Sequence, residues 1–214
     1  MGTSLSDGSY IVVSSDISGR AGSIDRRTAE TTIQVQLLID GVGVVDAKTD
    51  VPFLDHMLDA FGRHSRLDLI VKASGDAAMD PHHTVEDVGI AVGQAIQIAL
   101  GDRVGIERYG FAYAPLDEAL ARVVIDISGR PFLHFEAVMP EPVIGIDFAS
   151  SLVEEFWRAL AMNSGLTIHI DLIRARNSHH AAEAIFKAAA VAFRSAVSQT
   201  GIAGSVPSTK GVLA

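Results

Sequence analysis

The chain has 214 residues, of which 48% are hydrophobic and 20% are charged, a balance typical of a globular protein with a buried core. Its formal net charge of −9 argues against general nucleic-acid binding, which needs a basic surface. The sequence has no cysteines, so disulfides and thiolate metal sites are excluded, and a metal ion would need histidine, aspartate, glutamate or water as ligands.

The first segment, residues 1–22, is rich in serine and glycine, and we expect it to be a flexible extension. It lacks the basic and apolar blocks of a signal peptide, and no apolar run in the sequence is long enough for a membrane-spanning helix. We therefore expect a cytoplasmic protein with no membrane partner.

Strand and helix patterns alternate from residue 30 onward. Apolar residues alternate in TIQVQLLID (32–40), which predicts a strand, and Asp40-Gly41 predicts a hairpin turn into a return strand at 41–50. Helical periodicity follows Pro52 through residue 65. A strand is then predicted at 67–75, and a helix at 82–100 that Gly101 ends.

The second part of the chain repeats this order. Strands are predicted at 121–130, 132–140 and 166–175, and helices at 148–164 and from about residue 178 to residue 199. The repetition indicates an internal duplication with half-repeats at 23–118 and 119–205, followed by a C-terminal tail at 206–214. Each half would place two amphipathic helices against one sheet, so we predict an α+β fold with the helices packed between two mixed sheets.

The duplication carries one histidine-rich motif twice. DPHHTVED (80–87) and NSHHAAEA (177–184) each place two adjacent histidines ahead of a glutamate. In a helix, both histidines of a motif can reach the glutamate that follows them. Adjacent histidines diverge by about 100° around a helix, so we expect each pair to serve two different metal ions. The motif residues are His82, His83 and Glu86 in the first half and His179, His180 and Glu183 in the second.

Imidazole nitrogens and a carboxylate form a donor set suited to Mn, Fe, Ni, Co or Zn. A solvated histidine pair is the simplest alternative for one motif alone, but its repetition favours metal binding. The motif differs from the HExxH pattern of zinc proteases, in which the histidines are four residues apart. His56, on the preceding helix, is a further candidate ligand, and its counterpart in the second half is Glu155.

Basic residues beside glycine, serine or threonine are candidates for binding an anionic ligand. They occur in GIERYG (105–110), SGRPF (128–132), IFKAA (185–189) and PSTKG (207–211). Each alone is more simply a surface cation, although arginine offers a planar fork for phosphate oxygens. Lys187 lies one helical turn beyond Glu183 and so faces the predicted metal site.

Taken in order, these motifs resemble the imidazoleglycerol-phosphate dehydratase family of histidine biosynthesis. The resemblance covers residues 26–211 and is carried by RRTAETTIQVQLLIDGVG, VPFLDHMLDAFGRHSRLDL, DPHHTVEDVGIAVGQAI, APLDEAL, IDISGRPF, NSHHAAEAIFKA and PSTKG. It implies two repeated βββαβα halves of the kind found in domain 2 of ribosomal protein S5. It also implies self-assembly into a 24-mer built from trimers, with metal ligands drawn from neighbouring subunits.

The resemblance further implies two Mn²⁺ ions per active site and a small phosphate substrate. The residues that match metal ligands are His56, His82, His83, Glu86, His179, His180 and Glu183, with Glu155 at a position that is histidine in many members. The residues that match phosphate contacts are Arg108, Arg130, Lys187, Ser208 and Lys210. Glu30 matches a carboxylate placed for acid–base chemistry, and Glu30 and Glu183 are the hypothesised proton-transfer groups.

The implied reaction is the dehydration of D-erythro-imidazole glycerol phosphate to imidazole acetol phosphate. The proton that leaves carbon is not next to a carbonyl, so a metal ion on each ring nitrogen would help by stabilising the deprotonated ring. Two other hypotheses stay open at this point. One is a dinuclear metal-dependent phosphoesterase, and the other is a metal-binding assembly without catalysis.

Overall fold

The computed structural model describes residues 3–4, 10–11, 19–75, 80–202 and 204–209. The elements of the first half are β1 (Thr3–Ser4), β2 (Tyr10–Ile11), β3 (Ala21–Arg27), β4 (Thr31–Leu38), β5 (Val45–Lys48), α1 (Pro52–Ser65), β6 (Asp68–Gly75) and α2 (His82–Leu100). Those of the second half are β7 (Tyr109–Leu116), β8 (Ala119–Asp126), β9 (Phe132–Glu136), β10 (Val143–Ile144), β11 (Phe148–Ala149), α3 (Leu152–Ser164), β12 (Thr167–Arg174) and α4 (Ser178–Val197). Across these described ranges, no helix is both long and apolar enough to cross a membrane.

The two main sheets have the same strand order, which confirms the internal duplication. In the first sheet β3, β4, β6 and β5 lie side by side, with β1 and β2 added beyond β3, and in the second sheet the order is β7, β8, β12 and β9. The β5–β6 and β9–β12 pairs are parallel, and the other pairs of these eight strands are antiparallel. The predicted α+β fold of two βββαβα halves is therefore confirmed, with the small β10–β11 pair as an addition to the second half.

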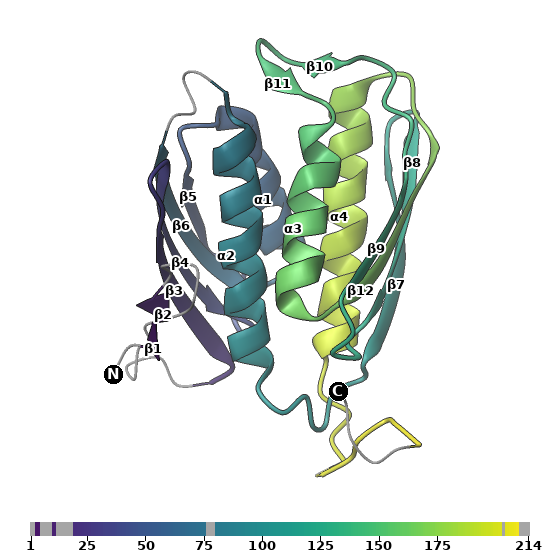
Figure 1. The fold of residues 1–214 in the computed structure, drawn as a ribbon. Helices are drawn as coiled ribbons and strands as arrows, with labels where there is room; N and C mark the ends of the chain where they lie inside the picture. Colours follow the sequence, from purple (N-terminus) through teal and green to yellow (C-terminus); the bar gives the residue numbers. More distant parts are fainter. Residues whose placement is uncertain (1–2, 5–9, 12–18, 76–79, 203, 210–214) are drawn as a thin grey trace.

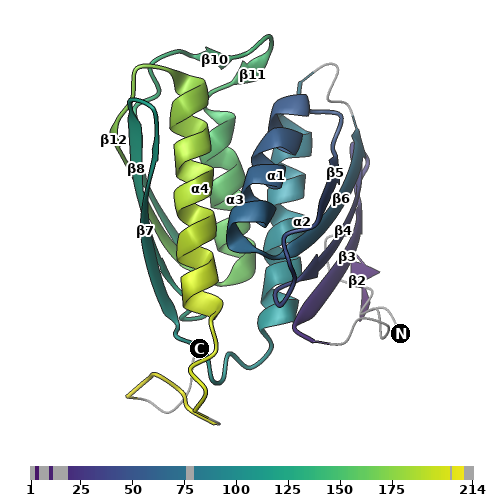
Figure 2. The same ribbon diagram turned by 180° about the vertical axis from the view of Figure 1, so that it is seen from behind.

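The four helices lie between the two sheets. Figure 1 shows the sheets on opposite sides of the helices, and Figure 2 shows the same layers from behind. α2 packs on α3 and α1 packs on α4, so each helix has its main helical partner in the other half. Alternate strand residues such as Ile33, Val35 and Leu37 are buried beneath these helices. One continuous hydrophobic core therefore joins the two halves.

The hairpin predicted at Asp40-Gly41 is wrong, because β5 does not pair with β4. Instead β5 runs parallel to β6 at the edge of the sheet. The carboxylate of Asp68 accepts hydrogen bonds from the backbone N–H groups of residues 42–44, at 2.9, 3.0 and 2.9 Å. These bonds hold the connection at the start of β6, so the chain passes that strand before β5 begins.

Two predicted boundaries also differ from the structure. β3 begins at Ala21, inside the segment predicted to be a flexible extension, most of which lies outside the described residues. β7 pairs with β8 in the second sheet, so the halves divide between α2 and β7 and not at residue 118. Neither AGSIDRR nor YGFAYAPL has a clear apolar alternation, because glycine and alanine supply much of the buried face.

Glycines allow each sheet to approach its central helix closely. A Cβ atom at Gly22 in β3 would meet the backbone of Ala95 in α2, and a Cβ atom at Gly110 in β7 would meet the backbone of Ala192 in α4. Gly22 pairs with Leu37 and Gly110 pairs with Ile125, which are equivalent positions of β4 and β8. The same close contact is therefore present in both half-repeats.

We expect Gly110→Val to lower the free energy of unfolding by about 1–3 kcal/mol, because the added side chain has no space against α4. Chemical denaturation of the metal-free protein followed by circular dichroism measures this change. The matched control is Gln36→Val, an exposed position of β4, which should change the stability by less than about 0.5 kcal/mol. Equal stability of the two variants would contradict the packing argument.

Candidate metal centre

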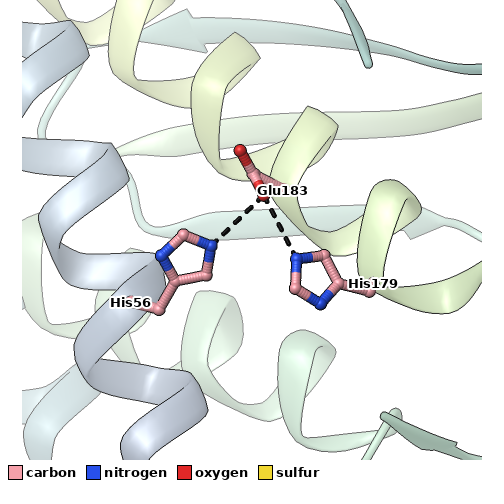
Figure 3. A group of neighbouring side chains, drawn as sticks. All are labelled: His56, His179 and Glu183. Carbon is pink, nitrogen blue, oxygen red and sulfur yellow. Dashed lines mark hydrogen bonds and ion pairs between the residues drawn. The ribbon is translucent and has the colours of Figure 1, made fainter. Parts of the chain in front are cut away.

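The first group of possible metal ligands, here called the His56 cluster, consists of His56, His179 and Glu183. Their ligand atoms all lie within 4.8 Å of one another. Oε2 of Glu183 lies 3.2 Å from Nε2 of His56 and 3.3 Å from Nε2 of His179. Figure 3 shows the two rings turned toward this carboxylate from two different helices. Two imidazole nitrogens and one carboxylate thus converge on one point.

The surroundings of the His56 cluster hold Glu183 in its ionised form. Burial opposes ionisation of this carboxylate, but hydrogen bonds from Lys187 and His56 outweigh it and lower the pKa of Glu183. Nζ of Lys187 lies 2.6 Å from Oε1 of Glu183, on the side away from the histidines. Phe53 packs edge-on against both rings, with centroid distances of 6.3 Å to His56 and 5.3 Å to His179.

The second group, here called the His82 cluster, consists of His82, Glu86 and Glu155, whose ligand atoms also lie within 4.8 Å of one another. His82 and Glu86 come from the first turns of α2, and Nε2 of His82 lies 3.9 Å from Oε2 of Glu86. Glu155 comes from the first turn of α3. Glu155 therefore lies beside two other possible ligands, as expected from its match to His56 in the first half. Its role as a ligand stays a prediction.

Both clusters join the two halves of the chain. In the His56 cluster, α1 of the first half meets α4 of the second, and in the His82 cluster, α3 of the second half meets α2 of the first. The two halves contribute to both clusters because α1 packs on α4 and α2 packs on α3. Neither half supplies all three donors of either cluster.

The second histidine of each motif belongs to neither cluster. We expected His83 to reach Glu86 and His180 to reach Glu183, but the contacts of these two glutamates with the motif histidines run to His82 and to His179. Nδ1 of His83 lies 3.5 Å from Glu30, in the turn between β3 and β4. The two histidines of each motif therefore turn toward different partners, which confirms the predicted divergence of the pairs.

The partner of His180 was not among the predicted site residues. Nδ1 of His180 lies 2.9 Å from Oε2 of Glu118, in the turn between β7 and β8. This hydrogen bond is the main reason that the pKa of Glu118 falls to about 2 and that the pKa of His180 is raised. A comparison of the two half-repeats could have found Glu118, because Glu30 occupies the equivalent turn one residue before the next strand.

The predicted phosphate contacts do not all lie together. Arg108 donates to Asp126 at 2.7 Å and to the carbonyl of Pro207 at 2.7 Å, and Arg130 lies 3.7 Å from Asp126. These contacts place Arg108, Arg130 and the segment that holds Ser208 at one end of the second sheet. Lys187 lies apart from them in the His56 cluster, and Lys210 lies outside the described residues.

A protein-family model described as imidazoleglycerol-phosphate dehydratase matches residues 49–193, which include both histidine motifs and both clusters. The chain belongs to the imidazoleglycerol-phosphate dehydratase family. It is therefore a lyase of histidine biosynthesis that removes water from imidazole glycerol phosphate. The phosphoesterase and the non-catalytic metal-binding assembly, which the sequence motifs left open, are not the activity of this family.

Curated dehydratases of this family are similar along almost their whole length. The protein from Acidiphilium cryptum is 53% identical over 195 residues, covering 91% of this chain and 99% of the relative. The protein from Symbiobacterium thermophilum is 51% identical over 194 residues, covering 91% of this chain and 93% of the relative. The extent of both matches indicates that the two half-repeats are shared with these relatives.

Solved structures of the family have the same fold. The imidazoleglycerol-phosphate dehydratase from Staphylococcus aureus superposes with a TM-score of 0.77 at 43% identity, covering 84% of this chain and 99% of that chain. The enzyme from Pyrococcus furiosus, solved in complex with (S)-C348, gives a TM-score of 0.75 at 36% identity, covering 88% and 99%. The duplicated architecture of this dehydratase is thus that of its solved relatives.

A buried polar network fixes the start of α2 in this family member. Asp87, next to Glu86, accepts hydrogen bonds from Nε and Nη2 of Arg26 at 3.1 and 2.9 Å and from the hydroxyl of Thr31. The side chains of Arg26 and Asp87 are only 10% and 12% exposed. The network therefore ties the helix that carries the His82 cluster to β3 and β4.

We expect Asp87→Ala to lower the free energy of unfolding by about 3–5 kcal/mol, because Arg26 would lose its buried countercharge. Urea denaturation measures the change. As a matched control, Asp59→Ala breaks only the exposed pair with Arg63 and should cost less than about 1 kcal/mol. A loss for Asp87→Ala no larger than that control would show that Asp87 does not anchor α2.

Proposed function

We propose that the chain converts D-erythro-imidazole glycerol phosphate to imidazole acetol phosphate with two Mn²⁺ ions per active site. The observation that carries this proposal is the pair of clusters, each of which gathers three nitrogen and oxygen donors from both halves of the chain. The family supplies the reaction, and the donor sets supply the reason for a metal. When bound, the ions act as Lewis acids that favour loss of a proton from the substrate ring.

The donor sets suit Mn²⁺ in kind, but each supplies only part of the ligands that the ion needs. Imidazole nitrogens and carboxylate oxygens bind such an ion, and no thiolate is available in this chain. An octahedral ion takes more ligands than the three donors of either cluster, so further groups are needed. His83 and His180, which lie in neither cluster, are the proposed additional ligands, contributed to the sites of neighbouring subunits.

The side chains around the sites have separate tasks in this proposal. Lys187 holds the carboxylate of Glu183 from the side away from the histidines, which keeps Glu183 ionised and oriented as a ligand. Glu30, whose side chain is 54% exposed beside His83, is available to transfer a proton. Glu183 stays a second candidate for proton transfer, as predicted from the sequence.

A single chain brings Lys187 to the His56 cluster but does not bring Arg108 there. The backbone N–H of Arg108 binds the carbonyl of Ala196, near the end of α4, whereas His179 stands at its start. At about 1.5 Å of rise per residue, these two positions are roughly 25 Å apart, which is much longer than the substrate. A neighbouring copy would therefore supply Arg108, Arg130, Ser208 and Lys210, which agrees with the proposed 24-mer built from trimers.

Lys187 is also a predicted phosphate contact. It is paired with Glu183 in the His56 cluster, so it would reach a phosphate only after leaving that carboxylate. The cytoplasmic location stays a prediction of the sequence.

The first test is turnover of imidazole glycerol phosphate by protein that has been stripped with a chelator and then reloaded with Mn²⁺. We expect the reloaded protein to form the ketone product without releasing inorganic phosphate, and the stripped protein to be inactive. Product is followed by absorbance after conversion to the enolate, and phosphate by a colorimetric assay. Equal turnover by stripped and reloaded protein would overturn the proposed role of the metal.

A second test asks whether both clusters hold an ion. We expect His56→Ala and Glu155→Ala each to remove about one of the two Mn²⁺ ions per chain, because each variant deletes a donor of one cluster. Elemental analysis of desalted protein gives the stoichiometry. The matched control is Glu154→Ala, next to Glu155 but paired with Arg158, which should keep both ions. Full metal content in Glu155→Ala would remove Glu155 from the ligand set.

A further inference from the structure

Two equivalent turns bring a glutamate to the second histidine of each motif. Glu30 precedes β4 and Glu118 precedes β8, and these strands occupy the same place in the two sheets. Glu30 lies near His83, at the start of α2, and Glu118 lies near His180, at the start of α4. The duplication thus made two acidic groups in equivalent places, and their contacts differ.

Glu118 is bound to the start of α4 at two points. Its Oε2 lies 2.9 Å from Nδ1 of His180, and its Oε1 accepts the backbone N–H of Arg176 at 3.1 Å. The backbone N–H of His180 in turn donates to Oδ1 of Asn177, the N-cap of α4, at 3.0 Å. Both the backbone and the ring of His180 are therefore held in place.

The hydrogen bond to Glu118 decides which nitrogen of His180 is available. An ionised carboxylate can only accept hydrogen bonds, so Nδ1 of His180 must carry the hydrogen that it shares with Glu118. In a neutral imidazole, the other nitrogen, Nε2, then keeps its lone pair. The contact selects one tautomer of the ring and leaves Nε2, on the far side from Glu118, as the donor atom.

Glu30 makes a looser contact. Its carboxylate lies 3.5 Å from Nδ1 of His83, which is longer than the Glu118–His180 hydrogen bond, and its side chain is 54% exposed compared with 31% for Glu118. The residue equivalent to Arg176 lies among residues 76–79, outside the described part of the chain. Of the two glutamates, Glu118 is the one with a fixed hydrogen bond to a proposed ligand.

We propose that Glu118 is a positioning residue that orients the ring of His180 and selects the tautomer whose Nε2 binds metal. The proposal rests on the proposed function, because it takes His180 to be a metal ligand. When the second nitrogen of a ligating histidine donates a hydrogen bond to a carboxylate, the bond fixes the ring and raises its basicity, and its loss typically costs 10–100-fold in metal affinity. Glu118 would act through His180, without touching the substrate.

The test uses three full-length variants. Glu118→Ala removes the acceptor, whereas Glu118→Gln keeps an oxygen that can accept from Nδ1. The matched control is Asp117→Asn, which removes one negative charge from the same turn and suits the positive φ of 46° at this position. Circular dichroism confirms that each variant is folded before it is used.

Nitrogen-15 NMR of histidine-labelled, metal-free protein reports the tautomer directly, at a pH where the His180 ring is neutral. We expect Nδ1–H in the wild type, Glu118→Gln and Asp117→Asn, and a shift toward the Nε2–H tautomer in Glu118→Ala. Assignment of the signal comes from its loss in His180→Gln. A wild-type ring that is mainly the Nε2–H tautomer would overturn the proposal without any reference to metal.

Mn²⁺ titration, followed by the electron paramagnetic resonance signal of the free ion, measures the consequence. We expect Glu118→Ala to bind one of its ions about 10–100-fold more weakly than the wild type, with Glu118→Gln recovering most of the loss. Unchanged affinity in Glu118→Ala, with normal binding and turnover by the wild type, would overturn this inference and leave the proposed function intact. A wild type that binds no Mn²⁺ would overturn both.

Discussion

The candidate metal centre depends on how closely the helices of the two halves approach one another. In α2, a Cβ atom at Gly89 or Gly93 would collide with the backbone of α3 at Phe156 or Leu160. The missing side chains let α2 and α3 pack closely enough for Glu155 to meet His82 and Glu86. Alanines do the same for α4, whose buried face is largely Ala. The possible metal ligands therefore come together because glycine and alanine, which have no ligand atoms in their side chains, let the helices pack closely.

The direction of the four helices explains which side chains lie at each of their ends. The candidate ligands lie in the first turns of α1, α2, α3 and α4, so all four helices present their N-terminal ends to the clusters. The positive end of a helix dipole favours ionised carboxylates there. At the opposite end, arginines bind the last carbonyls, since Arg20 donates to Val197 at 2.6 Å and Arg194 donates to His64 at 3.1 Å. Arginine side chains thus bind the last turns of α1 and α4.

The two half-repeats share the same backbone arrangement but differ in the side chains at equivalent positions. His56 is matched by Glu155, so the two clusters differ in their number of imidazoles. Asp87, which binds Arg26, is matched by a buried alanine in α4, so the second half has no such carboxylate at the equivalent position. The same backbone, used twice, therefore offers two different sets of donor atoms.

The sequence by itself determined the elements whose signal is local. Helical spacing places each histidine pair near the start of a helix, and i to i+4 spacing brings His82 to Glu86 and His179 to Glu183. The repetition of that pattern predicted the duplication, and the resemblance of the motifs predicted the family. Only the tertiary structure decided the contacts between distant segments. These contacts are the packing of α1 on α4 and of α3 on α2, the parallel pairing of β5 with β6, and the hydrogen bond between His180 and Glu118. Their partners depend on packing and on backbone hydrogen bonds across the whole core, which no local pattern records.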